Sequence, residues 1–220
     1  MHYTGAVTQP DDSKAQYPYA HAPRLPRSGD VAIAALTRAE GPIEIEIGPG
    51  RGAFLLDRVV ERPDLRVVGL EIRWKWATIV DERLAKLGHG DRARVYAEDA
   101  RHVLPRFSPA QSVSAFFIHF PDPWWKTRQK KRLVVTRSLL DQVARLLVPN
   151  GMLFVQTDVE DRGEAYETLI AAHEHFAPNG DAPGSARLAS CPWTSRGNRE
   201  LRADDAGLPV VRLRYQRKAV

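Results

Sequence analysis

The order of apolar and helical segments constrains the fold of this chain more than any other feature of its sequence. Runs typical of strands occupy 43–47, 66–70, 93–97, 112–120 and 152–156. Segments with helical spacing of apolar residues follow them at 53–61, 74–87, 101–104, 136–147 and 163–176. Strands that alternate with helices in this way predict a parallel sheet with crossover helices. We therefore expect an α/β fold with a Rossmann-like, doubly wound, mostly parallel sheet.

The remaining segments are placed around this sheet. Ser112–Phe120 is almost continuously apolar, which is typical of a central strand buried on both faces. The segments near Leu188 and from Val210 to Tyr215 are expected to close the sheet as a hairpin-like pair with an antiparallel C-terminal strand. The short apolar segment Val31–Leu36 predicts a helix at one edge.

The composition predicts a basic globular domain with an N-terminal extension. Residues 1–27 lack any period and are expected to form a mobile or loosely packed arm, which leaves 28–220 as a single domain. The single cysteine, Cys191, excludes an internal disulfide and suits the cytoplasm. No apolar run reaches the roughly 18 residues of a membrane span. The net charge is +5, and its clustering at 126–132 favours a polyanionic partner.

A glycine-rich loop, Gly48-Pro-Gly50-Arg-Gly52, follows the first strand of the sheet, and Glu46 lies two positions before it. Glycines allow a tight turn and close approach of the backbone to a ligand. Dinucleotide-binding loops have the spacing G-x-G-x-x-G, so the spacing G-x-G-x-G argues against a nicotinamide dehydrogenase. The acid suits a ligand with a cationic amino-acid end. A purely structural turn is the alternative.

Two further acids follow the next two strands. Glu71 ends the second strand, where a carboxylate can accept both hydroxyls of a ribose. Asp99 follows the third, where an acid can accept a hydrogen bond from the exocyclic amine of adenine. The alternatives are a helix-dipole interaction for Glu71 and an N-cap for Asp99. Acids at three successive strand ends match an adenosine ligand without phosphates, and S-adenosylmethionine has that composition.

The fourth strand leads into Phe120-Pro-Asp122-Pro-Trp-Trp-Lys126. Two prolines restrict the backbone on either side of Asp122 and hold its carboxylate in place. The tryptophans offer flat faces on which a base can stack, although core packing is an alternative for either one. Cations that suit a phosphate backbone follow, namely Lys126, Arg128, Lys130, Lys131 and Arg132.

The fifth strand leads into Asp158, which is expected either to cap the next helix or to line the pocket beside Asp122. His119 lies within the strand pattern and is expected to be packed or hydrogen-bonded. Because no set of His, Cys and carboxylate residues has metal-ligand spacing, we predict no metal.

These motifs, taken in order over roughly Ile43 to Phe176, resemble the bacterial tRNA (guanine-N7)-methyltransferases. The resemblance implies the class I methyltransferase fold, a cytoplasmic enzyme and methyl transfer from S-adenosylmethionine to N7 of a guanine in tRNA, namely guanine 46 in the variable loop. It implies a catalytic role for Asp122 and substrate contacts for Lys126, Asp158 and Thr194. The implied cofactor-binding residues are Glu46, Gly48, Gly50, Glu71, Asp99 and Asp122, and the implied RNA-binding residues are Arg128, Lys130, Lys131 and Arg132.

The sequence departs from that family near its C-terminus. The family has a Thr-x-x-Glu motif there, whereas this chain has Thr194-Ser-Arg-Gly197 with Glu200 three residues further on. Gln129 and Leu133 stand where the family commonly has His and Arg. The alternatives are an RNA-binding protein that keeps the fold without catalysis, and a methyltransferase that acts on another substrate. Both a monomer and a homodimer are compatible with the sequence.

Overall fold

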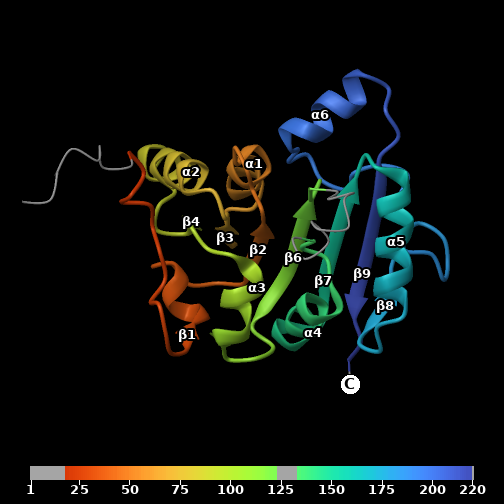
Figure 1. Cartoon of the computed structure of the whole chain (residues 1–220), viewed down its shortest axis with the longest axis horizontal. Helices are drawn as coiled ribbons and strands as arrows, with labels where there is room; N and C mark the ends of the chain where they lie inside the picture. Colours follow the sequence, from red (N-terminus) through yellow and green to blue (C-terminus); the bar gives the residue numbers. More distant parts are fainter. Residues whose placement is uncertain (1–17, 123–132, 220) are drawn as a thin grey trace, which may run out of the picture.

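The computed structural model describes residues 18–122 and 133–219. Its centre is a seven-stranded sheet in the order β4-β3-β2-β6-β7-β9-β8 (Figure 1). The strands are β2 (Ile43–Ile47), β3 (Arg66–Leu70), β4 (Ala93–Tyr96), β6 (Val113–His119), β7 (Leu147–Thr157), β8 (Phe176–Pro178) and β9 (Val211–Arg217). Neighbours from β4 to β7 pair in parallel, whereas β9 is antiparallel to both β7 and β8. The predicted doubly wound sheet with an antiparallel C-terminal strand is confirmed.

Helices cover both faces of this sheet, as doubly wound topology requires. One face carries α1 (Ala53–Glu61) and α2 (Trp74–Lys86), and the other carries α3 (Ala100–Val103), α4 (Arg137–Leu146) and α5 (Glu160–Ala171). Side chains alternate between the faces along each strand. Ile45 and Phe116 are therefore buried toward α3, α4 and α5, while Phe117 and Phe154 pack with Phe54 of α1. In Figure 1, α6 (Asn198–Asp205) lies beyond the carboxyl ends of β6 and β7.

The predicted helix at Val31–Leu36 is instead a two-residue strand, β1 (Val31–Ala32), followed by a single 3-10 turn, η1 (Ile33–Leu36). β1 pairs in parallel with β5 (Phe107–Ser108), and η2 (Leu104–Arg106) directly precedes β5. The pairing with β5 takes up the first two residues of the apolar segment, so too few remain for an α-helix.

The predicted hairpin-like pair is only partly formed. β9 closes the sheet as expected, but the segment near Leu188 contributes a single isolated bridge, from Arg187 to Leu213. Residues 180–185 form a tight loop closed by the hydrogen bond from Gly180 N to Ser185 O, and β8 occupies the place beside β9. The helix predicted over 163–176 accordingly ends early, at Ala171.

The described part of the predicted N-terminal arm runs along the edge of the domain. Ala22 is buried, and Pro23 O accepts a hydrogen bond of 2.7 Å from Ala97 N. Leu25 N donates to Glu98 Oε1 at 2.9 Å. Residues 1–17 of the arm lie outside the described residues. Among the helices of the described ranges, none has the length and apolar character needed to cross a membrane.

Candidate cofactor and substrate site

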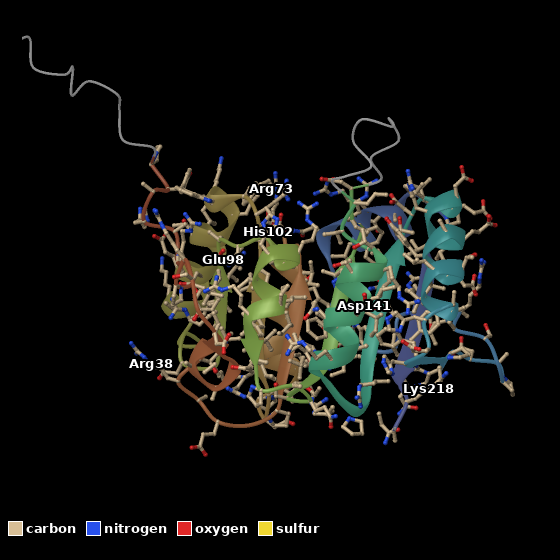
Figure 2. The ribbon with its side chains drawn as sticks, turned by 60° about the horizontal axis from the view of Figure 1, so that its bottom comes forward. Arg38, Arg73, Glu98, His102, Asp141 and Lys218 are labelled. Atoms are coloured by element: carbon tan, nitrogen blue, oxygen red, sulfur yellow. The ribbon has the colours of Figure 1, made fainter. Side chains whose placement is uncertain are left out.

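A cavity of about 430 Å³ opens where the carboxyl ends of β2, β3, β4 and β6 meet. Open α/β sheets bind ligands at this edge, and the volume lies in the range of small-molecule pockets. Four predicted site residues line it, namely Gly48, Glu71, Asp99 and Asp122. Arg73, which also lines it, lies with His102 at the upper end of Figure 2, while Arg38 and Lys218 lie toward the opposite end.

The glycine loop between β2 and α1 has the conformation that its sequence predicts. Gly48, Gly50 and Gly52 all have positive φ, at 76°, 56° and 73°. A Cβ on Gly52 would lie 2.4 Å from Val80 Cγ1 of α2, so only glycine allows this approach. Gly50 N donates a hydrogen bond of 2.8 Å to Glu71 Oε2. The loop is therefore attached to the end of β3, and both segments border the cavity.

Glu71 holds the cavity wall together. Its side chain is almost wholly buried, and Oε1 accepts hydrogen bonds from Arg73 N (2.9 Å) and Arg73 Nε (3.1 Å). A carboxylate offers about four lone-pair sites, so these contacts and the one to Gly50 leave capacity for a ligand hydroxyl. The backbone donors also orient the carboxylate before any ligand binds.

Asp99 is the N-cap of α3, one of its two predicted roles, and its place in the cavity lining is compatible with the other. It caps α3 by accepting a hydrogen bond of 3.0 Å from Arg101 N, and it lines the cavity. Burial acts to raise the pKa of Asp99, but hydrogen bonds from the side chain and backbone of Arg101 outweigh it and lower that pKa. The group is therefore an anion at neutral pH, able to accept a hydrogen bond from a ligand amine.

Glu46 lies beside the cavity rather than in its lining, and it forms a buried pair with His119. Glu46 Oε1 is 2.8 Å from His119 Nδ1, and their side chains are only 3% and 6% exposed. Within the described ranges, Glu46 Oε2 and His119 Nε2 have no hydrogen-bond partner. A buried carboxylate with a free oxygen favours a neighbouring cationic group. The expectation that His119 is packed or hydrogen-bonded is confirmed, but the strand pattern did not identify Glu46 as its partner.

The predicted substrate-binding residues that the structure describes lie apart from the cavity lining. Asp158 follows β7 and pairs with Arg199 of α6, at 2.7 Å. Thr194 donates its backbone N–H and its hydroxyl to Glu61 Oε1, both at 2.9 Å. The remaining predicted residues, Lys126, Arg128, Lys130, Lys131 and Arg132, lie outside the described residues.

Comparison with known proteins assigns the chain to a family. Residues 40–206 match a family model described as "Putative methyltransferase". The tRNA (guanine-N(7)-)-methyltransferase of Myxococcus xanthus is 34% identical over 81% of this chain and 85% of its own length. That of Anaeromyxobacter dehalogenans is 36% identical over 82% and 88%. The chain belongs to the tRNA (guanine-N7)-methyltransferase family. S-adenosylmethionine is accordingly its methyl donor, as the three acids at the strand ends predict.

Solved structures show the same fold for this methyltransferase at low sequence identity. The 16S rRNA methyltransferase KamB has a TM-score of 0.55 and 14% identity, over 82% of this chain and 90% of that one. The aminoglycoside resistance methyltransferase NpmB1 has a TM-score of 0.50 and 18% identity, over 83% and 89%. The agreement supports the class I methyltransferase fold.

The residues of the cavity fit S-adenosylmethionine. Glu71 keeps acceptor capacity for ribose hydroxyls, and Asp99 is an anion at the position expected for the adenine amine. Glu46 lies beside the lining, and the negative charge on its unpaired, buried Oε2 favours the ammonium group of the amino-acid end nearby. Among the residues that the structure describes, no cluster of three or more His, Cys, Asp or Glu has the arrangement of a metal site.

We expect Glu71→Gln to weaken binding of S-adenosylmethionine. The amide removes the negative charge and places an N–H₂ group where the carboxylate accepts from Gly50 N or Arg73 N. The loss of one hydrogen bond from a ribose hydroxyl to the charged carboxylate corresponds to roughly a tenfold rise in Kd or more. Isothermal titration calorimetry measures this, with Glu82→Gln on the exposed face of α2 as the control. An unchanged Kd contradicts the role of Glu71.

We expect the free energy of unfolding to fall in acid as Glu61 becomes protonated. Burial acts to raise the pKa of Glu61, but hydrogen bonds from Thr194, Ser195 and Arg58 outweigh it and lower that pKa from its ordinary value of 4.5 to about 2. Since the folded-state pKa is the lower one, the stabilisation is complete above about pH 4.5 and is lost as the pH falls toward 2. The difference in unfolding free energy between the native chain and Glu61→Gln should shrink across this window. A constant difference contradicts the assignment.

Proposed function

We propose that this methyltransferase transfers the methyl group of S-adenosylmethionine to N7 of a guanine in tRNA, and that its target is guanine 46 of the variable loop. The observation that carries the proposal is the convergence of Glu71, Asp99 and Asp122 on one cavity at the carboxyl edge of the sheet. Glu71 and Asp99 supply the acceptors that an adenosine group needs. Asp122, the third acid of the cavity, is available to contact the base that receives the methyl group. The curated relatives bear the name of the same activity.

The chemistry requires little proton transfer. N7 of guanine carries an in-plane lone pair and no proton at neutral pH, so no general base is needed. When bound, S-adenosylmethionine supplies a sulfonium methyl group that bonds to the N7 lone pair while the electrons of the broken S–C bond stay on sulfur. The enzyme therefore contributes alignment and charge stabilisation.

Asp122 and Asp158 divide the work on the base. Positive charge develops on the imidazole ring of guanine as N7 becomes methylated, and a fixed carboxylate near that ring favours the transition state. A second carboxylate that accepts hydrogen bonds from N1–H and the exocyclic amine selects guanine over adenine. Asp122 is exposed at the cavity rim, and the Asp158 side chain is 9% exposed beside the end of β7. The basic residues Arg128, Lys130, Lys131 and Arg132 bind the tRNA backbone.

The test is incubation of the protein with methyl-labelled S-adenosylmethionine and an unmodified tRNA transcript, followed by mapping of the labelled nucleotide. We expect 7-methylguanine at position 46. A matched transcript with adenine at that position should remain unlabelled. Label on another base, on rRNA or on protein contradicts the substrate assignment. Cofactor binding without turnover on any tRNA would identify a binding protein that has lost catalysis.

A further inference from the structure

α6 is anchored at the carboxyl edge of the sheet by a buried acid. Glu200 is 0% exposed and accepts a hydrogen bond of 3.1 Å from Gln156 Nε2 of β7. It also pairs with Arg196 Nε at 2.9 Å and Arg212 Nη2 at 3.3 Å. The carboxylate is thus held by two strands of the sheet, β7 and β9, and by the segment just before α6. This network places α6 over the ends of β6 and β7 (Figure 1).

Arg199, the residue before Glu200, contacts a different acid, Asp158. Its Nε and Nη2 lie 3.0 Å and 2.7 Å from the same oxygen, Oδ2, of Asp158. The Asp158 side chain is 9% exposed, whereas the Arg199 side chain is 62% exposed. Within the described ranges, Arg199 is the cation that contacts Asp158. The guanidinium therefore lies between the carboxylate and solvent.

The contact between Arg199 and Asp158 can be exchanged for a contact between Arg199 and another anion. Because the Arg199 side chain is 62% exposed, water can replace it on the Asp158 carboxylate, so breaking the pair costs less than breaking a fully buried one. The contact is directed at a single carboxylate oxygen, whereas a guanidinium binds phosphate with two parallel hydrogen bonds. A polyanion that approaches the edge of the sheet offers Arg199 a stronger partner. Because Glu200 holds α6, such an exchange needs only a change of the Arg199 side chain.

We propose that Arg199 covers Asp158 in the free enzyme and moves to a phosphate of the bound tRNA, which frees the carboxylate for the target base. The inference rests on the proposed function, since it takes tRNA as the polyanion and Asp158 as a contact of the base. Arg199 thereby couples binding of the RNA backbone to exposure of a base-selecting acid. It acts as a substrate-binding and positioning residue that the sequence motifs did not identify.

The test compares Arg199→Ala, Arg199→Lys and the native enzyme in equilibrium binding of tRNA at several salt concentrations. Loss of one phosphate contact lowers the slope of log K against log salt concentration by about one and weakens binding roughly fivefold at moderate salt. Arg199→Lys keeps the charge and should keep the slope. The control is Arg38→Ala, because Arg38 is also an exposed arginine paired with an aspartate (Asp91, 3.3 Å), near the opposite end of the molecule (Figure 2). Arg38→Ala should leave the salt slope and the affinity for tRNA unchanged.

Two further measurements separate this proposal from a structural role. Arg199→Ala should leave the Kd of S-adenosylmethionine within about twofold of the native value and raise KM for tRNA. Asp158→Asn should lower kcat without weakening tRNA binding, because it releases Arg199 for phosphate. A lower kcat for Arg199→Ala with an unchanged salt slope would mean that Arg199 only orients Asp158, and would overturn the proposal. Failure of the native enzyme to methylate tRNA would instead overturn the proposed function, and the salt slopes are measured without turnover.

Discussion

Asp122→Asn lowers the rate of methyl transfer by about a hundredfold to a thousandfold at saturating cofactor and tRNA, which is the range for removing one preorganised electrostatic group. Asp122 lies three residues after the end of β6, in the cavity lining with Glu71 and Asp99. Asparagine keeps the shape of the side chain and removes the charge that opposes the positive guanine ring. Because Asp122 is exposed, the substitution should change the free energy of unfolding by less than about 0.5 kcal/mol.

The measurement is single-turnover methylation of an unmodified tRNA transcript, together with thermal unfolding of both proteins. Asp64→Asn is the matched control, because Asp64 is an exposed aspartate that pairs with Arg62 just before β3, at the other end of the strands. It should retain the native rate. Full activity of Asp122→Asn would remove Asp122 from the catalytic role. A fall that occurs only at low cofactor concentration would limit Asp122 to cofactor binding.

The sequence predicts the edge of the sheet that carries the site because topology determines it. The bounds of β2 and β3 match the predicted strands at both ends. In a parallel sheet the carboxyl ends of neighbouring strands lie on one edge, so acids such as Glu71 and Asp99 must come together there. The Arg101 guanidinium lies two positions from Asp99 and follows from the helix start. The Gly50 amide is 21 positions from Glu71 and reaches it because β2 and β3 are neighbouring parallel strands.

The contacts that sequence reasoning missed join residues far apart in the chain. Thr194 and Glu61 are separated by 133 positions, and Arg199 and Asp158 by 41. Nothing in a local pattern specifies which acid an arginine on an amphipathic helix will contact. The Glu46–His119 pair depends on the register of β2 against β6, which periodicity does not reveal. A single strand pattern shows which residues share a face but leaves open which neighbour lies opposite.

Removing the buried charge of Arg58, which lies in α1, should have the largest effect on the free energy of unfolding. Arg58 is 6% exposed and donates from Nε and Nη2 to the two oxygens of Glu44, at 2.8 Å and 2.9 Å. Its third nitrogen, Nη1, donates to Glu61 at 2.9 Å. Burial acts to lower the pKa of Arg58, but hydrogen bonds and charge from Glu44 outweigh it and raise that pKa. Arg58 is therefore charged throughout the accessible pH range.

Arg58→Met removes that charge and leaves Glu44, which is 4% exposed, as an unpaired buried carboxylate. Breaking a buried ion pair at one partner costs about 3–5 kcal/mol. For a domain of this size each kcal/mol corresponds to about 2–4 °C, so we expect Tm to fall by roughly 10 °C. Urea unfolding and thermal unfolding monitored by circular dichroism measure both quantities.

The double variant Glu44→Leu/Arg58→Met provides the decisive comparison. Apolar side chains of similar volume often replace a buried ion pair with little loss of stability, so the double variant should recover most of what the single one loses. Recovery would show that the penalty comes from the unpaired buried charge of Glu44 rather than from lost packing against Phe117 and Trp193. The centroids of these rings lie 5.7 Å and 5.5 Å from the guanidinium carbon. If the loss in the double variant instead equals the sum of the losses in Glu44→Leu and Arg58→Met, lost packing is the cause. A single variant that unfolds at the native temperature would mean that water reaches Glu44 when Arg58 is absent.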